Sequence, residues 1–181
     1  MPAEFESVAC LVVLVGPPGS GKTTWARRHG RGFPERLVHV SQDDLIDAIT
    51  PHGFDHVYRP VYAAAEDAVA RAGLESGHTV IVDRTNRTRT HRERWLRLAR
   101  EFACPAIAVE MTTSLAICRE RNRSRTDRRR LSEERMDRMI AAMQPVASDE
   151  GFAAIYDGDT IDLAGILQKE ENYHEYCHKA R

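Results

Sequence analysis

Short apolar runs alternate with amphipathic stretches along the 181 residues of this chain. Five of these runs are rich in valine, isoleucine, leucine and alanine and have the character of buried strands. They fall at residues 11–15, 37–40, 78–83, 106–111 and 153–156. Because helical spacing separates them, the pattern predicts an α/β fold: a parallel sheet of about five strands with helices on both faces.

Capping and breaking residues indicate where the intervening helices begin and end. Helices are predicted over residues 23–28, 43–49, 60–76 and 88–102, from residue 114, and from residue 132 to a stop at Pro145. Thr88, Ser114 and Ser132 stand at three of the starts, where side-chain oxygens cap free backbone N–H groups. We expect one domain over residues 1–181, in which the polar tail 168–181 has no assigned element.

Residues 16–23, Gly-Pro-Pro-Gly-Ser-Gly-Lys-Thr, form a complete G-x-x-x-x-G-K-[ST] phosphate-binding loop between a predicted strand and a predicted helix. Lys22 is expected to reach the β- and γ-phosphates of ATP, and the Thr23 hydroxyl to ligate Mg²⁺. A chance glycine turn, or a loop with a purely structural nucleotide, is less favoured because strand, loop and helix are in register. The residues expected to hold ATP here are Gly16, Pro17, Gly19, Ser20, Gly21, Lys22, Thr23 and Thr24.

Two adjacent acids follow the second predicted strand. In parallel sheets, ligands lie over the carboxyl ends of the strands, so Asp43 and Asp44 are expected to face the phosphate loop. A carboxylate there can accept the proton of an attacking hydroxyl, whereas acids at this point can also cap or stabilise a helix. We predict Asp43 as the general base and Asp44 as a helix cap or supporting residue beside the substrate.

The third predicted strand ends in Asp83-Arg84-Thr85-Asn86. Asp83 occupies the position from which an acid reaches Mg²⁺, directly or through water. Arg84, Thr85 and Asn86 offer donors to a bound substrate, although Thr85 and Asn86 are equally suited to capping the next helix.

Arginine supplies almost all the positive charge and is concentrated between residues 84 and 130, although the net charge is only −1. Residues 119–130 contain seven arginines, which would repel one another unless they are solvated or face anions. An exposed basic helix is the better interpretation for any single arginine. For the segment as a whole we predict a lid over residues 119–131 that closes on the triphosphate.

The remaining composition narrows the class of protein. Its 42% hydrophobic and 29% charged residues are typical of a globular domain. The sequence contains neither a signal-peptide pattern nor an apolar run near the ~20 residues of a membrane span. Cys10, Cys104, Cys118 and Cys177 lack C-x-x-C spacing, which favours reduced thiols and a cytoplasmic protein.

With these motifs in order, residues 10–157 resemble the kinase domain of the polynucleotide 5′-hydroxyl kinase family. The similarity rests on Gly16–Thr23, Asp43-Asp44, Asp83-x-Thr85-Asn86, Cys118-x-x-Arg121-Asn122…Arg125 and the stretch 144–152. The resemblance implies a P-loop kinase that uses ATP and Mg²⁺, and a 5′-hydroxyl end of DNA or RNA as its substrate. It implies that Lys22, Asp43, Arg121 and Arg125 are catalytic, with both arginines on the ATP phosphates. It also implies that the stretch after Pro145, within 144–152, lies near the adenine.

One position departs from the family pattern. Phage polynucleotide kinase has an arginine shortly after the catalytic aspartate that contacts the acceptor phosphate, and Ile46 stands at that position here. The substitutes within reach along the sequence are His52, His56, Tyr58, Arg59, Arg84, Arg87 and Arg89. Ile46 keeps open a kinase for another hydroxyl, such as a small metabolite, a sugar, an antibiotic or a modified base in DNA. A non-enzymatic ATP-binding module is the third interpretation.

Overall fold

One parallel sheet organises the molecule. The structure, a computed structural model, describes residues 9–31, 37–161 and 166. In this part of the chain, five strands pair in the order β2-β3-β1-β4-β5. Their bounds are Leu11–Val15 (β1), Leu37–Ser41 (β2), Thr79–Asp83 (β3), Ala106–Glu110 (β4) and Ala154–Asp157 (β5). Every predicted strand is confirmed to within one residue at each end. The tail 168–181, to which no element was assigned, lies outside the described residues.

The helices alternate with the strands as predicted. Their bounds are Lys22–Gly30 (α1), Gln42–Ile49 (α2), Arg59–Glu75 (α3), Arg89–Glu101 (α4), Leu115–Ser124 (α5) and Glu133–Ala141 (α6), with 3-10 turns at His56–Tyr58 (η1) and Ser148–Glu150 (η2). Thr88, Ser114 and Ser132 cap α4, α5 and α6 by accepting backbone N–H groups. Each such cap is worth about 1 kcal/mol, which explains why these helices begin where the sequence indicates.

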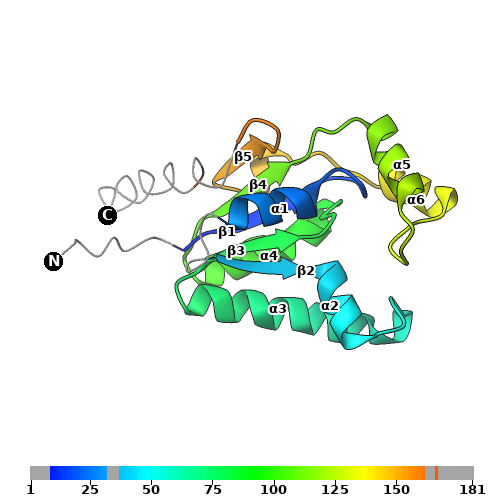
Figure 1. Ribbon diagram of the computed structural model, residues 1–181. Helices are drawn as coiled ribbons and strands as arrows, with labels where there is room; N and C mark the ends of the chain where they lie inside the picture. The colour runs from blue at the N-terminus through cyan, green and yellow to red at the C-terminus, as the bar shows by residue number, and fades with distance from the viewer. Residues whose placement is uncertain (1–8, 32–36, 162–165, 167–181) are drawn as a thin grey trace.

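Helices cover both faces of the sheet, as Figure 1 shows. Alternate residues of β1 separate the two cores: Leu11, Val13 and Val15 pack with α3 and α4, including the fully buried Trp95. Val12 and Leu14 pack with Trp25 and Ala26 of α1 on the opposite face. The period-2 alternation of a central strand therefore supplies one apolar surface to each helical layer.

The buried stripe of α3 contains a carboxylate. Tyr62, Glu66, Ala70, Gly73 and Leu74 face inward, whereas Val61 and Val69 are exposed. Gly73 is required by close packing, because a Cβ there would lie 2.8 Å from Val80 Cγ2. The inward position of Glu66 was not indicated by the alanine and valine spacing of this helix, and it contributes to the site described below.

The strand order reverses at β1, which lies between β3 and β4. Loops after β1, β2 and β3 therefore emerge together at the carboxyl edge of the sheet, the usual ligand-binding edge of such folds. Figure 1 shows α2 at this end of the sheet, and α5 and α6 standing beyond it. The lid, residues 119–131, comprises the second half of α5 and the loop that leads to α6.

None of the helices in the described part of the chain combines the length and apolar character needed to cross a bilayer. No disulfide joins the three described cysteines, Cys10, Cys104 and Cys118.

Candidate active site

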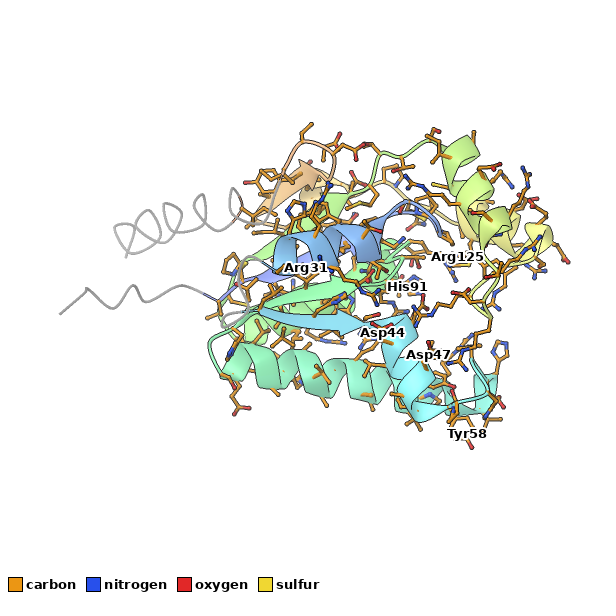
Figure 2. All side chains as sticks on the ribbon, viewed as in Figure 1. Arg31, Asp44, Asp47, Tyr58, His91 and Arg125 are labelled. Atoms are coloured by element: carbon orange, nitrogen blue, oxygen red, sulfur yellow. The ribbon has the colours of Figure 1, made fainter. Side chains whose placement is uncertain are left out.

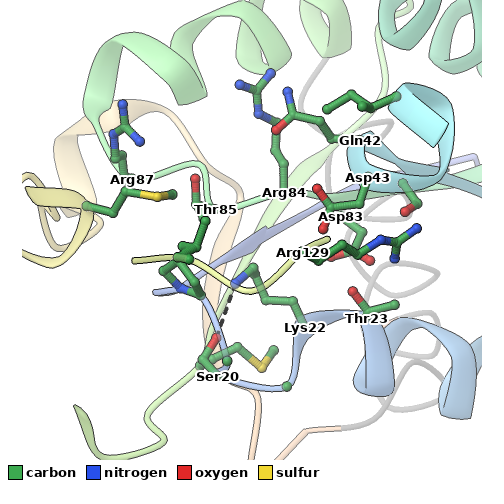
Figure 3. Close-up of a pocket in the computed structure, with 18 of the residues that line it drawn as sticks. Ser20, Lys22, Thr23, Gln42, Asp43, Asp83, Arg84, Thr85, Arg87 and Arg129 are labelled. Atoms are coloured by element: carbon green, nitrogen blue, oxygen red, sulfur yellow. Dashed lines mark hydrogen bonds between the residues drawn. The ribbon is translucent and has the colours of Figure 1, made fainter. Parts of the chain in front are cut away.

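A cleft of about 1640 Å³ opens at the carboxyl edge of the sheet. The phosphate loop, α2, the β3–α4 loop and the lid line it, together with the amino-terminal part of α3. Drug-sized ligands occupy pockets of roughly 300–1,000 Å³, so this cleft has room for a nucleoside triphosphate and for part of a second molecule. Figure 3 shows Lys22, Asp43, Asp83 and Arg129 gathered around its centre.

The phosphate loop has the conformation its glycines permit. Gly19 and Gly21 have φ of +80° and +98°, in the left-handed region that other residues rarely adopt. The loop wraps the Lys22 ammonium, which donates to Gly16 O at 2.9 Å, Pro17 O at 2.7 Å and Ser20 Oγ at 3.3 Å. Burial lowers the pKa of Lys22 to about 8, although Asp83 and Asp43 favour its charged form.

The predicted ATP-binding residues divide into two groups by position. Those that line the cleft are Gly19, Ser20, Gly21, Lys22, Thr23 and Thr24. Gly16 and Pro17 do not line it, but their carbonyl oxygens hold Lys22. The loop is also fixed to the next strand, because Gly16 N–H donates to Thr85 O at 3.2 Å.

The phosphate loop contacts the start of α5 directly. A Cβ on Gly19 would lie 2.5 Å from the Cys118 carbonyl oxygen, so this position needs glycine for space as well as for its φ. Thr113 Oγ1 donates to Ser20 O at 2.9 Å, and Arg121 donates to Gly19 O at 3.1 Å. The phosphate loop therefore packs directly against the start of α5 and is bonded to Arg121 of the lid.

Asp43 lines the cleft from the first turn of α2. The helix is capped by Ser41, whose hydroxyl accepts Asp44 N–H at 3.3 Å, so Asp43 is not used as a cap. Burial by the cleft walls raises the pKa of Asp43, and the neighbouring Asp83 raises it further, against the opposing effect of Arg129. A carboxylate with a raised pKa, open to a cleft, has the properties of a general base.

Asp44, expected as a helix cap or supporting residue beside the substrate, differs from its neighbour, and Ser41 caps the helix in its place. Asp44 does not line the cleft; Arg27 contacts its carboxylate at 3.2 Å and Arg129 at 2.8 Å. Burial alone would raise the pKa of Asp44, but hydrogen bonds from Arg129, Ser41 and Arg27 lower it. Adjacent residues in a helix point about 100° apart, which agrees with the different surroundings of Asp43 and Asp44.

Asp83 ends β3 inside the cleft and is 5% exposed. His39 Nε2 lies 3.1 Å from its Oδ2, and Thr23 lines the same cleft. No group of three or more His, Cys, Asp or Glu side chains is arranged as a metal cage among the described residues. The Thr23 hydroxyl and the Asp83 carboxylate fit Mg²⁺, because this ion is usually held by few protein ligands together with phosphates and water.

Asn86 makes structural contacts, the second of the two roles that the sequence left open for it. It is fully buried, its amide nitrogen donates to Leu14 O at 2.8 Å, and its Oδ1 accepts the Trp95 indole N–H at 3.1 Å. Asn86 also has a positive φ of 42°, which asparagine tolerates better than most residues. Its amide therefore fixes the β3–α4 turn, while Thr85 and Arg84 line the cleft.

The lid brings its predicted arginines to the cleft. Arg121 and Arg125 both line it, and Arg125 also donates to Arg129 O at 3.2 Å. Asn122 closes the lid loop, because its side chain donates to Leu131 O and accepts Leu131 N–H, both at 2.9 Å. The lid thus has a defined shape in the described structure rather than being an extended basic segment.

Sequence reasoning missed the arginines that join the lid to α2. Arg129 contacts Asp44 and Asp47, and Arg128 contacts Asp47 at 2.7 Å. Figure 2 shows Asp44 and Asp47 on α2, at the same end of the molecule as Arg125 of the lid. The only available signal was the surplus of lid arginines, which did not indicate which of them would find acidic partners.

A second missed feature is a charge cluster around one buried carboxylate behind the β3–α4 loop. Glu66 of α3 is 1% exposed, and its Oε2 accepts from Arg84 at 2.8 Å and from Arg94 at 3.0 Å. In Figure 3, Arg84 extends away from Lys22. Burial lowers the pKa of Arg84, and burial together with the nearby arginines lowers the pKa of His91.

The other residues proposed as substitutes for the missing arginine are also divided by the structure. His56, Arg59 and Arg87 line the cleft, as does Ile46 itself. Arg89 instead binds the Asp149 carboxylate at 3.1 Å and does not line the cleft.

The stretch 144–152, which the resemblance places near the adenine, does not line the cleft. It is held by the fully buried Arg92 of α4, which donates to Glu150 Oε2 at 2.7 Å and to the carbonyl oxygens of Gln144 and Pro145. Residues 158–161, a little further along the chain, do line the cleft.

Comparison with known proteins agrees with this arrangement. A family model described as an AAA domain (AAA_33) matches residues 11–146, which is most of the chain. The bifunctional polynucleotide phosphatase/kinase of Schizosaccharomyces pombe is 25% identical over 150 residues, which are 80% of this chain and 32% of that protein. This chain therefore spans about a third of the length of that relative.

Solved structures share the fold. Kti12 of Chaetomium thermophilum, in complex with ADP-AlF3, has a TM-score of 0.64 at 19% identity and covers 90% of this chain and 97% of its own. The APS kinase CysC of Mycobacterium tuberculosis, in complex with AMPPNP and APS, has a TM-score of 0.58 at 17% identity. The match covers 93% of this chain and 98% of the CysC chain. The α/β, P-loop kinase-like fold predicted from the sequence is confirmed.

Proposed function

We propose that this chain, which belongs to the AAA_33 family of AAA domains, is an ATP-dependent phosphotransferase that phosphorylates the 5′-hydroxyl end of DNA or RNA. The observation that carries the proposal is the placement of Asp43 in the cleft that Lys22 and the lid arginines also line. A module that only binds ATP has no use for a base at that point. The polynucleotide acceptor is supported by the similarity to a polynucleotide phosphatase/kinase and by the arginines that surround the cleft.

The proposed reaction is an in-line attack of the acceptor hydroxyl on the γ-phosphorus of ATP. Asp43 orients the hydroxyl and accepts its proton, for which its raised pKa is suited. Lys22, released from the loop carbonyls, and Arg121 and Arg125 stabilise charge on the transferring phosphoryl group. Thr23 and Asp83 would hold Mg²⁺, directly or through water, and when bound the ion neutralises charge on the β- and γ-phosphates.

Transfer of labelled γ-phosphate from ATP to oligonucleotides tests this proposal. With Mg²⁺ present, we expect label on 5′-hydroxyl DNA or RNA and none on the same strand carrying a 5′-phosphate. Asp43→Asn should lower turnover about 10²–10³-fold, the usual range for a group acting on the transition state. Asp67→Asn, on the outer side of α3 where Asp67 pairs with Arg71, is the matched control and should be unaffected.

Two results would contradict the proposal in different ways. Label on both the 5′-hydroxyl and the 5′-phosphate strand would exclude the 5′ end as the acceptor. Full activity of Asp43→Asn would exclude Asp43 as the base while leaving the reaction itself intact.

A kinase for another hydroxyl is the second candidate, and Ile46 is the observation that favours it. Ile46 lines the cleft and is 8% exposed, in the position where the phage enzyme has an acceptor-binding arginine. This candidate uses the same Lys22, Asp43 and lid. It predicts AMPPNP binding and slow ATP hydrolysis without any label on nucleic acid ends.

A further inference from the structure

The cleft extends beyond the phosphate-binding centre, between α3 and the amino-terminal part of α4. Glu66, Arg84, His91 and Arg94 line this extension, and none of them has a part in the phosphoryl transfer proposed above. Arg84 follows Asp83 at the end of β3 and extends away from Lys22 (Figure 3), so we assign this extension to the acceptor side of the cleft.

Hydrogen bonding in this extension is incomplete. Four buried side-chain polar atoms in the described part of the chain have no hydrogen-bond partner within the protein. Three of them are here: Glu66 Oε1, Arg84 Nε and His91 Nδ1. A buried polar atom left without a partner costs about 1–3 kcal/mol, and such groups gathered in one cleft are typical of a ligand site.

The unused atoms restrict the chemistry of the ligand. Glu66 Oε1 is an acceptor and needs a ligand donor, whereas Arg84 Nε is a donor and needs a ligand acceptor. A phosphate or sulfate offers only acceptors and would be repelled by the Glu66 carboxylate. The edge of a nucleobase presents a donor next to an acceptor, which matches this pair.

An aromatic wall stands one helical turn from Glu66. Tyr62 precedes Glu66 by four residues on α3, a spacing that brings side chains within roughly 5–6 Å at their Cβ atoms. The Phe54 ring packs against Tyr62 at 5.6 Å between centroids, remains 38% exposed and lines the cleft. Exposed aromatic rings beside arginines are the usual platform on which bases of single strands stack.

We propose that Glu66, Arg84 and Phe54 form a subsite for the terminal nucleobase of the acceptor strand, with the base edge bound by Glu66 and Arg84 and its face against Phe54. The inference rests on the proposed function, since it assumes a polynucleotide acceptor. It offers a means of holding the strand end that does not need the arginine replaced by Ile46. Binding through the base also requires the base to be unpaired, so the subsite selects single-stranded or frayed ends.

The subsite is tested with two 5′-hydroxyl oligonucleotides that differ only in the first nucleotide, which is either normal or an abasic tetrahydrofuran residue. We expect removal of the base to lower kcat/KM at least about tenfold, the loss corresponding to one hydrogen bond to a charged group. In Glu66→Gln and in Phe54→Ala the two oligonucleotides should differ by no more than about threefold. Phe54→Ala guards against a folding defect, because the Phe54 ring is partly exposed.

Two controls isolate the effect. Glu75→Gln changes an exposed carboxylate at the far end of the same helix and should keep the full preference for a terminal base. An abasic residue placed in the interior of the strand should have no effect on any variant. Equal kcat/KM of the wild-type chain on both oligonucleotides would overturn the subsite while the proposed function stood.

If no oligonucleotide is phosphorylated, the proposed function fails and the subsite is tested by binding alone. Calorimetric titration of deoxynucleosides into protein saturated with AMPPNP and Mg²⁺ keeps the donor site occupied. Binding that is lost in Glu66→Gln and retained in Glu75→Gln would support the subsite. Absence of binding by any deoxynucleoside would overturn it.

Discussion

Arg92–Glu150 and Arg84–Glu66 are both arginine–glutamate pairs with a buried carboxylate, yet they use their hydrogen-bonding capacity differently. Arg92 contacts both Glu150 oxygens and the carbonyl oxygens of Asn86, Gln144 and Pro145. Arg84 makes one bond to Glu66 and keeps an unpartnered Nε. The first pair fastens the 144–152 stretch to α4, whereas the second faces the cleft with capacity to spare. A buried carboxylate paired with an arginine therefore does not by itself distinguish a structural pair from a ligand-binding one; the completeness of the hydrogen bonding does.

The largest expected effect is on folding stability and separates the two pairs. Arg92→Met should destabilise the protein by about 3–5 kcal/mol, because it leaves the buried Glu150 carboxylate unpaired. Arg84→Met should cost only about 1–2 kcal/mol, since Arg94 still binds Glu66 and the cleft admits water. Urea unfolding of both variants followed by circular dichroism gives the two values. Equal losses would contradict the distinction between the pairs.

A smaller effect is expected on ATP affinity. It concerns Lys22, a buried cation beside the proposed chemistry. Its pKa of about 8 means that the free protein holds Lys22 protonated below pH 8 and neutral above it. Because ATP phosphates favour the charged form, ATP affinity should fall as the pH rises above about 8, approaching tenfold per pH unit. Calorimetry with AMPPNP between neutral and alkaline pH measures this slope. Lys22→Met should bind weakly with little dependence on pH, and an unchanged slope in that variant would assign the effect to another group.

The smallest expected effect concerns the lid. Arg129 contacts Asp44 and Asp47 near the surface, where about a quarter of its own side chain (27%) remains exposed. Partly exposed ion pairs contribute about 0–1 kcal/mol, so Arg129→Gln should hardly change the free energy of unfolding. A double-mutant cycle with Asp47→Asn measures the pair directly. A coupling energy as large as that of Arg92 with Glu150 would mean that the lid is a fixed part of the fold.

The fold was predictable because its signals are local. Apolar runs such as residues 11–15 mark strands, and Thr88, Ser114 and Ser132 mark helix starts through bonds to residues only three positions away. The phosphate loop was predictable for the same reason, since its geometry depends on glycines within the motif itself.

The rest of the site depends on contacts between distant parts of the chain. Glu66 of α3 pairs with Arg84 of the β3–α4 loop and with Arg94 of α4. Its burial runs against the preference of carboxylates for the surface. The role of Asn86 stayed open in the sequence because an asparagine after a strand is equally suited to binding a ligand or to bonding the backbone. The structure shows the Asn86 amide nitrogen 2.8 Å from Leu14 O and its Oδ1 3.1 Å from the Trp95 indole nitrogen, so the side chain bonds within the protein.

The narrow contact between Gly19 and the Cys118 carbonyl has a consequence for how the two halves of the cleft respond to ligands. Because the Cys118 carbonyl closes the space beside Gly19, a nucleotide that moved the loop backbone toward α5 would displace the start of α5. Such a coupling is reciprocal. If phosphate binding at the loop changes the affinity of α5 for a second ligand by some factor, that ligand changes the affinity of the loop for phosphate by the same factor. An acceptor strand that engages the lid would thereby tune the affinity for ATP without touching it.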